Sequence, residues 1–341
     1  MAKAKKDRVF LVTGATGMVG GHVAETLRAQ YATVRCLVRK NSDTAFLESI
    51  GVEFCYGDVT DTAAVDAAVK GADVVFHCAA MVSDWASREE MERVNVGGTQ
   101  NIIDACLKYG VQRMVMVSSL AVLGMGKQIN ANETAPYVYT GDNYNYTKIE
   151  SEKRVLAAIR EKKLPGVIVR PPYIYGPRDR QLLPRVVQFL KEKKFKFIGG
   201  GANPISLVYV KNLVDVMMRA AESEKAVGQV YHVTDGTDIS RKEFITELAQ
   251  KLGYEVPTQS VPEGVAKMLC PVLEWVNKVT GSKEPPLLNK FKMKFMVTYL
   301  TFDISKAKNE LGYNPAYTYK QGLEETVAWF KSQKEEPAGV S

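Results

Sequence analysis

Short runs of apolar residues alternate with segments of helical periodicity along the first half of the chain. The runs are continuous and rich in β-branched residues, which is typical of strands that are buried on both faces of a parallel sheet. They lie at 9–12, 34–38, 52–58, 73–80, 113–119 and 166–171. Because helical patterns follow most of these runs, the chain is predicted to be an α/β protein with a Rossmann-type, doubly wound parallel sheet.

The alternation ends near residue 178, where the segments become mixed and rich in loops. One later run, QVYHVTD at 229–235, predicts a strand that is able to return to the sheet. We therefore expect 1–177 to form mainly the Rossmann domain and 178–330 mainly a smaller substrate-binding lobe. The end of the chain, 331–341, has the polar composition of a disordered tail.

Composition narrows the classes of function. The 341 residues have a formal net charge of +7, from 45 basic and 38 acidic side chains, without a polybasic block. This balance predicts no nucleic-acid partner. Five scattered cysteines without a CxxC pair and three histidines without ligand spacing predict no disulfide framework and no metal site. No signal-peptide pattern occurs and no apolar run reaches the roughly eighteen residues of a membrane span, so a cytoplasmic location is expected.

Three glycines follow the first strand in the stretch VFLVTGATGMVGGHVAETL. Their GxxGxxG spacing allows a tight turn and close approach to a pyrophosphate at the positive end of the next helix. The alternative is a glycine turn that only packs helix on strand. Within a complete βαβ unit, the loop predicts dinucleotide binding. The residues expected to bind the cofactor here are Gly14, Thr16, Gly17, Met18, Val19 and Gly20.

The residues after the second strand indicate which dinucleotide is bound. An acidic residue at this point would bind the ribose hydroxyls of NAD, but the strand ends in VRCLVRKNSD, with Arg39 and Lys40. A guanidinium suits a 2′-phosphate. The sequence therefore favours NADP(H). NAD(H) is the alternative, in which Arg39 faces solvent and Asp43 binds the ribose.

The ends of the third and fourth strands contribute further candidates for the cofactor site. Asp58, with Val59 beside it, is placed to accept a hydrogen bond from the adenine amino group, to cap the next helix, or to do both. The small residues of HCAA permit close backbone approach, and here the candidates are Cys78, Ala79 and Ala80.

The stretch YNYTK places Tyr144 and Lys148 four residues apart on a predicted helix. This spacing lets both side chains face one cleft. An ammonium group near a phenol is expected to lower the pKa of the phenol and make it a usable acid or base. The fifth strand ends in Ser118 and Ser119, and a serine hydroxyl there can hydrogen-bond the substrate oxygen.

Seven motifs in this order resemble those of the extended short-chain dehydrogenases/reductases. They are TGATGMVG, GDVTD, FHCAA, NVGGT, VSSLAVLG, YNYTK and RPPYIYGP. The resemblance implies that Tyr144 is the general acid/base, that Lys148 binds the ribose and tunes Tyr144, and that Ser119 orients the reacting oxygen. It also implies further roles. Asn95 is structural or part of a proton relay, Ser118 lines the cofactor, and Pro171 and Tyr173 lie by the nicotinamide.

Three departures from the family's sugar-nucleotide enzymes argue against a nucleotide-sugar substrate. Tyr173 stands where an asparagine holds the sugar nucleotide, and Ile205 stands where an arginine grips the diphosphate. Leu120 and Ala121 stand where the 4,6-dehydratases carry an Asp-Glu pair. A nucleotide-sugar 4-epimerase with tightly bound NAD is kept as the alternative function.

Four stretches carry a further resemblance in the second lobe: RPPYIYGPRDRQLLPRVV, GGGANPISLVYVKNLVDVM, GQVYHVTDG and EPPLL…TYLTFDISKAKNELGYNP. They resemble 3β-hydroxysteroid dehydrogenases, sterol-4-carboxylate 3-dehydrogenases and 2-alkyl-3-oxoalkanoate reductases. This resemblance implies oxidoreduction of a 3-hydroxy or 3-oxo group on a bulky hydrophobic substrate. Met81, Val82 and Trp85 follow the fourth strand and are candidates to line the substrate pocket with Ser119 and Tyr173. The alternative is that Met81, Val82 and Trp85 are core residues. The amphipathic stretch 264–300 indicates a substrate lid, a weak membrane-surface contact, or ordinary packing between lobes. A homodimer is common in the resembling family.

Overall fold

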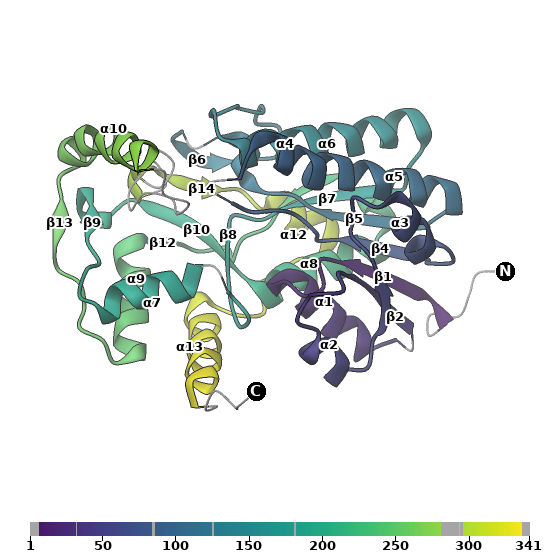
Figure 1. Ribbon diagram of the computed structural model, residues 1–341, viewed down its shortest axis with the longest axis horizontal. Helices are drawn as coiled ribbons and strands as arrows, with labels where there is room; N and C mark the ends of the chain where they lie inside the picture. Colours follow the sequence, from purple (N-terminus) through teal and green to yellow (C-terminus); the bar gives the residue numbers. More distant parts are fainter. Residues whose placement is uncertain are drawn as a thin grey trace.

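The computed structural model describes residues 7–31, 33–83, 86–124, 126–180, 182–280, 293 and 296–335. Seven strands form one sheet in the order β11-β7-β5-β4-β1-β2-β3, and every neighbouring pair is parallel (Figure 1). The strands are β1 Val9–Thr13, β2 Thr33–Val38, β3 Glu53–Tyr56, β4 Val74–His77, β5 Arg113–Val117, β7 Gly166–Arg170 and β11 Val230–His232. The predicted Rossmann-type sheet is therefore confirmed, and the run at 229–235 does return to it.

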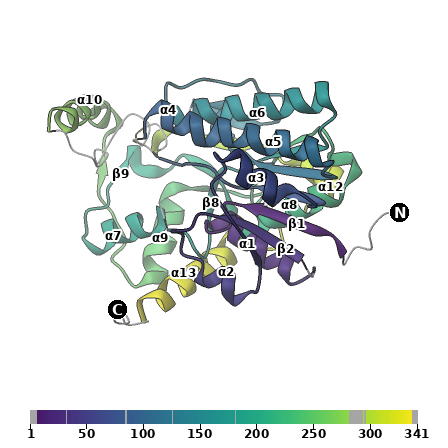
Figure 2. The same ribbon diagram turned by 45° about the vertical axis from the view of Figure 1, so that its right-hand side comes forward.

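Helices cover both faces of this sheet because both faces are apolar. Along β1, Phe10 and Val12 point into one core, whereas Leu11 points into the other. Figure 2 shows α3, α5 and α6 on one side of the sheet and α1 and α2 on the other. The first set is α3 Thr62–Val69, α5 Gly98–Tyr109 and α6 Asn143–Lys162. Two of the helices on the other face, α8 and α12, come from the second half of the chain. The helices on that face are α1 Met18–Arg28, α2 Ala45–Ser49, α8 Val210–Glu222 and α12 Ser305–Leu311.

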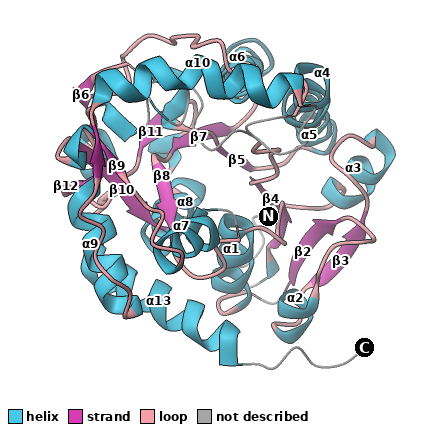
Figure 3. Ribbon diagram, turned by 60° about the vertical axis from the view of Figure 1, so that its left-hand side comes forward, coloured by secondary structure: helices cyan, strands magenta, loops and turns pink. Residues whose placement is uncertain are grey.

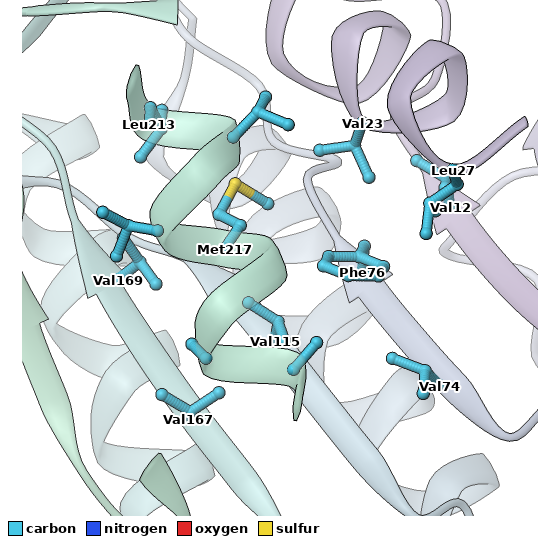
Figure 4. Packing of buried hydrophobic residues seen from close by; sticks show 14 of the residues in the cluster. Val12, Val23, Leu27, Val74, Phe76, Val115, Val167, Val169, Leu213 and Met217 are labelled. Carbon is cyan, nitrogen blue, oxygen red and sulfur yellow. The ribbon is translucent and has the colours of Figure 1, made fainter. Parts of the chain in front are cut away.

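The core between the sheet and α8 shows how a late helix completes the Rossmann domain. Leu213 and Met217 of α8 face Phe76, Val115 and Val169 of the central strands (Figure 4). All five side chains are fully removed from solvent. Burying an apolar side chain of this size contributes about 1.5–3 kcal/mol. The Rossmann half is thus not a contiguous stretch of sequence, because α8 lies beyond residue 178.

A second sheet forms the smaller lobe. It has the order β12-β10-β14-β6, and β8 pairs with β10. Its strands are β6 Gln128–Ala131, β8 Tyr173–Tyr175, β10 Pro204–Tyr209, β12 Asp238–Ser240 and β14 Leu300–Phe302. A two-stranded ribbon joins β9 Phe197–Ile198 to β13 Ser260–Val261. The helices of the lobe are α7 Leu182–Lys191, α9 Arg241–Leu252, α10 Glu263–Val279 and α13 Tyr319–Glu335.

The chain passes between the two halves several times. β6 lies before residue 177 but belongs to the lobe sheet, whereas α8, β11 and α12 lie after it and belong to the Rossmann half. The last helix, α13, continues to Glu335, which is five residues into the segment expected to be a disordered tail. The rest of that segment, 336–341, lies outside the described residues.

Candidate active site

The glycine loop lies at the carboxyl end of β1, where ligands of doubly wound sheets bind. Gly14 has a φ of +67°, and a Cβ there would lie 2.7 Å from the backbone nitrogen of Ala79. A Cβ on Gly20 would overlap the carbonyl oxygen of Gly14. Gly17 is the N-cap of α1 and provides no side-chain cap, so the first N–H groups of the helix are available to an anion. This cradle fits a dinucleotide pyrophosphate.

A buried histidine fixes the floor of the loop. The two ring nitrogens of His77 lie 2.9 Å from the hydroxyl of Thr13 and 3.0 Å from that of Thr99. Thr13 also accepts a hydrogen bond of 3.2 Å from the backbone N–H of Ala79. Burial, assisted by the charge of Lys148, lowers the pKa of His77 to about 3, so the ring is neutral. Sequence reasoning took HCAA as cofactor floor for its small residues and missed this role of the histidine.

The residues expected at the adenosine end surround the carboxyl end of β2. Arg39 and Lys40 follow the last residue of the strand, Val38, and both are exposed. Asp43 is already paired, because Arg180 donates to it at 2.8 Å. That bond is the main cause that lowers the pKa of Asp43. The arrangement leaves the two cations accessible and occupies the acid that was the alternative ribose ligand.

Asp58 does not cap the next helix, contrary to the second role considered for it. The N-cap of α3 is Asp61, whose side chain accepts from two backbone N–H groups. Asp58 instead uses one carboxylate oxygen to accept from the N–H and the hydroxyl of Thr60, both at 2.9 Å. Val59 is buried beneath Gly98, where a Cβ would lie 2.7 Å from the valine side chain. This close packing joins the third strand to α5.

The catalytic candidates come together beside the nicotinamide end of the predicted cofactor site. Tyr144 lies in the first turn of α6, and Lys148 follows one turn later with its ammonium group 5.8 Å from the centroid of the Tyr144 ring. Lys148 is 5% exposed and donates a hydrogen bond of 3.0 Å to the carbonyl of Val117, at the end of β5. Ser119 accepts from the N–H of Ala121 at 3.1 Å and hydrogen-bonds the Tyr144 hydroxyl.

The pKa of Tyr144 differs from the expectation. Burial of the phenol raises it to about 12, although the hydrogen bond with Ser119 acts in the opposite direction. Burial also lowers the pKa of Lys148 to about 8, against a raising effect of Glu152. The expected lowering of the Tyr144 pKa is therefore wrong for the cofactor-free protein. A protonated phenol is nevertheless the form that can donate a proton to a substrate oxygen.

Asn95 holds two segments together beside helix α6. It lies in the π-helical segment η2, Glu92–Gly97, and is 2% exposed. Its amide group donates to the carbonyl of Met81 and to the hydroxyl of Thr147, both at 3.0 Å, and its oxygen accepts from the N–H of Met81 at 2.7 Å. The side chain thus fixes Met81 to α6, in agreement with a structural role.

The remaining cofactor candidates line the same edge of the sheet. Ser118 is buried, and its hydroxyl has no partner among the described residues. An orphaned buried hydroxyl directly after β5 fits a bound cofactor that supplies the missing partner. Pro171 accepts from the N–H of Leu120 at 2.9 Å, and Tyr173 begins β8 opposite Leu207. The other cofactor candidates are Thr16 in the glycine loop, Met18 and Val19 in the first turn of α1, and Cys78 and Ala80 directly after β4.

A buried ion pair was missed by sequence reasoning. Glu152 is fully buried and accepts from Arg170 at 2.9 Å and 2.6 Å, and from the hydroxyl of Tyr137 at 2.8 Å. Glu152 follows Lys148 by four residues, just as Lys148 follows Tyr144, so all three share one face of α6. That spacing in YNYTKIESE was the available signal.

Asn145 was also missed, although it fixes the start of α6. Its amide group donates to the carbonyls of Ala121 at 2.6 Å and Val138 at 3.1 Å, and its oxygen accepts from the N–H of Thr140 at 3.1 Å. Asp142 caps the helix by accepting from the N–H of Asn145 at 2.8 Å. The turn that carries Tyr144 is therefore held on both sides.

The expected substrate side is apolar and open. Val82 is 50% exposed beside the half-buried Met81, and Trp85 lies outside the described residues. On the other side of the first turn of α6, Tyr139 is 55% exposed. Ile205, at the position of the family's diphosphate arginine, is buried within the lobe sheet.

Helix α10 presents an apolar stripe to solvent. Its residues recur at the three- and four-residue spacing of one helix face. They are Val265, Met268, Leu269, Val272, Trp275, Val276 and Val279, which are 41–70% exposed. The opposite side buries Ala266 and Cys270 against Ile198 and Met293. Figure 1 shows the helix at the outer end of the lobe, and Figure 3 shows it running along the top of the view. Within the described parts of the chain, no helix is long and apolar enough to cross a membrane.

Comparison with known proteins agrees with this architecture. The model of the NAD dependent epimerase/dehydratase family matches residues 10–234. The 3beta-hydroxysteroid-dehydrogenase/decarboxylase isoform 1 of Arabidopsis thaliana is 32% identical, over 98% of this chain and 82% of that protein. The decarboxylating sterol-4-alpha-carboxylate 3-dehydrogenase of Mus musculus is 32% identical, over 97% of this chain and 92% of that protein. The crystal structure of gox2253 has a TM-score of 0.80 at 30% identity, covering 96% of this chain and 99% of that one.

Proposed function

Because this chain belongs to the NAD dependent epimerase/dehydratase family, we propose from its site that it is an NAD(P)-dependent oxidoreductase acting on a bulky hydrophobic substrate. The reaction interconverts a secondary alcohol and a ketone at a 3-hydroxy or 3-oxo position of a sterol, a steroid or a long-chain β-keto acid. The observation that carries this proposal is the grouping of Tyr144, Ser119 and Lys148 at the carboxyl end of β5, in the same sheet as the glycine loop after β1. The names of the two enzyme relatives support the substrate class.

The chain's own residues have defined tasks in the reductive direction. A bound nicotinamide supplies the hydride that adds to the carbonyl carbon. Tyr144, which is protonated at neutral pH, donates its proton to the carbonyl oxygen. Ser119 holds that oxygen by a hydrogen bond as negative charge develops on it. Lys148 supplies a nearby positive charge, which stabilises the phenolate that remains. In the oxidative direction the same proton returns to Tyr144.

The cofactor side favours NADP(H). Arg39 and Lys40 are exposed directly after β2, where the adenosine ribose of a Rossmann cofactor lies. Asp43, which would favour NAD(H), is held by Arg180. Two cations beside a 2′-phosphate give charge-assisted contacts that NAD(H) lacks. NAD(H) is expected to bind more weakly.

The stripe on α10 supports a weak contact with a membrane surface. An amphipathic helix with aromatic and aliphatic residues on one face lies in the interface of a bilayer, and basic residues near it strengthen the contact with anionic lipids. The sequence from 278 to 294 carries five lysines and one glutamate. A hydrophobic substrate dissolved in the bilayer would be close to the lobe in this arrangement. The homodimer stays a prediction of the family resemblance.

Oxidation of NADPH and NADH, followed at the nicotinamide absorbance, tests the proposal. A 3-oxosteroid and a 2-alkyl-3-oxo fatty acid are compared as substrates. Turnover of either ketone with preference for NADPH would support it and identify the substrate class. No turnover of any ketone, together with tightly bound NAD in the purified protein, would favour the nucleotide-sugar epimerase instead.

A further inference from the structure

The loop between β8 and α7 reaches across to the adenosine end of the site. Arg178 donates to Glu25 of α1 at 2.6 Å and stacks on the ring of Phe46 of α2 at 4.0 Å. Two residues later, Arg180 donates to the carboxylate of Asp43 at 2.8 Å. A segment that belongs to the lobe side of the sequence therefore places a guanidinium in the loop that follows β2.

The loop after β2 brings positive and negative groups to one place. The N–H of Ser42 donates to the carbonyl of Arg39 at 3.0 Å, which closes a turn and keeps Asp43 near the end of the strand. Arg39 forms no ion pair with any residue in the described ranges, whereas Asp43 is paired with Arg180. The carboxylate of Asp43 also accepts from the N–H of Ala45, and both bonds favour its charged form.

The charge of Asp43 has opposite consequences for the two cofactors. A free carboxylate there would repel a 2′-phosphate and would be available to a ribose hydroxyl. A carboxylate that is paired with a guanidinium does neither. The cofactor preference set by Arg39 therefore depends on a second arginine from outside the βαβ unit.

We propose that Arg180 is a specificity residue for the adenosine 2′-phosphate, which acts by neutralising Asp43 beside Arg39. The inference rests on the proposed preference for NADP(H) and adds a residue that the dinucleotide motifs do not contain. Arg180 and Asp43 are 61% and 56% exposed, so the pair is worth little to stability. Its effect on cofactor binding is electrostatic, because salt does not fully screen a charge that lies within a Debye length of the phosphate.

Binding of adenosine 2′,5′-bisphosphate and of adenosine 5′-monophosphate to the full chain, measured by calorimetry, tests this role without turnover. Arg180→Met is expected to weaken binding of the bisphosphate about three- to tenfold, since it leaves one extra negative charge near the phosphate. Asp43→Asn is expected to strengthen it by a similar factor. The double variant is expected to bind within about twofold of wild type, and the monophosphate is expected to change less than twofold throughout.

The control is Arg160→Met, which removes an exposed guanidinium at the far end of α6 and is expected to change neither affinity. If the double variant binds the bisphosphate as weakly as Arg180→Met, the arginine does not act through Asp43 and the inference is overturned. Unchanged affinity in both single variants of a protein that prefers the bisphosphate overturns it as well. A wild type that prefers the monophosphate instead contradicts the proposed cofactor, which is a separate result.

Discussion

The edge of the Rossmann sheet that carries the candidate catalytic residues and helix α10 differ in how their side chains are covered. At the edge, polar groups are buried and the protein itself satisfies nearly all of them, as for Asn95 with Met81 and Thr147. On α10, apolar groups are exposed, and Met268 and Trp275 are 70% and 65% exposed. The first arrangement requires each buried polar group to find a partner, and it fixes the distances between the side chains. The second leaves an apolar surface that a membrane or a partner molecule can cover.

The difference separates two kinds of function within one fold. Groups at the edge must keep a fixed distance to one another, because proton transfer works over hydrogen-bond distances. Groups on α10 need only be apolar and on one face, because partition into an interface has no fixed partner geometry. Substitutions should therefore be severe at the edge and almost silent in stability on α10.

The largest effect is expected at the proton donor. Tyr144→Phe removes the hydroxyl that transfers its proton to the substrate oxygen in the proposed mechanism, and turnover should fall about 10²- to 10⁴-fold. Binding of the cofactor should persist, because the glycine cradle is untouched. Turnover and cofactor affinity are measured on the same preparation.

The matched control is Tyr146→Phe. That tyrosine lies two residues away in the same helix but stacks beneath Arg88, at 3.7 Å, and against Tyr139. The ring is retained in phenylalanine, so turnover should change less than about tenfold. A similar loss in both variants would mean that disturbance of α6, and not loss of the donor, causes the effect.

Sequence patterns predicted the parts of this site that are local in the chain. The seven strands were visible because each is a continuous apolar run, and Tyr144 with Lys148 was visible because helix geometry fixes a four-residue spacing. The four-residue spacing placed Glu152 on the same helix face as Lys148, but its partner Arg170 was not visible, since the pair joins a helix to a strand end. The pKa of Tyr144 was predicted in the wrong direction because burial of the phenol raises it more than the hydrogen bond with Ser119 lowers it, and burial is a property of the fold.

The chain passes several times between the Rossmann half and the lobe, and the sequence could not predict this for a similar reason. β14 pairs with β6 across roughly 170 residues, through Leu300 opposite Gln128. Such a pairing has no local signal, because both strands are only three or four residues long. The period-2 pattern that identifies longer strands is absent at this length.

The next largest effect is expected from the buried ion pair behind Lys148. Glu152→Gln keeps the side-chain volume but leaves the guanidinium of Arg170 buried without its charge partner, which should cost about 3–5 kcal/mol of unfolding free energy. Urea unfolding at constant pH measures it. Glu150→Ala is the control on the same helix, since its ion pair with Lys153 is at the surface and should be worth less than about 1 kcal/mol. Equal losses would show that burial of the pair is unimportant.

Acid should weaken the Rossmann half specifically, because all three histidines lie there. Burial lowers the pKa of His22 to about 4 and the pKa values of His77 and His232 to about 3. The pKa of a histidine in the unfolded chain is about 6.5. When the pH falls below this value, the unfolded chain binds protons that the folded chain does not, so the free energy of unfolding falls. From pH 7 to about pH 5.5 the loss should be on the order of 1 kcal/mol per histidine.

Urea unfolding across this pH range checks the sign and the size of the effect. His22→Gln removes one titrating group while keeping a donor for the carbonyl of Met18, which the ring of His22 contacts at 2.8 Å. The slope of stability against pH should become flatter by about one third, because each histidine contributes about equally. An unchanged slope would mean that His22 stays neutral or charged equally in both states.

The smallest effect on stability, and the clearest separation of the two regions, is expected on α10. Trp275→Ser together with Met268→Ser should change the unfolding free energy by less than about 1 kcal/mol, since both side chains are exposed in the folded chain. Binding to vesicles of phosphatidylcholine mixed with phosphatidylserine, measured by co-sedimentation, should nevertheless be lost.

Lys267→Ser, next to Met268 on the same helix, is the control and should weaken binding only slightly. Turnover of a water-soluble ketone should stay unchanged in all of these variants, because none of the proposed catalytic residues lies on α10. If wild-type protein ignores the vesicles but dimerises, and the double serine variant is monomeric, the stripe is a contact between two copies of the chain and the membrane proposal is wrong.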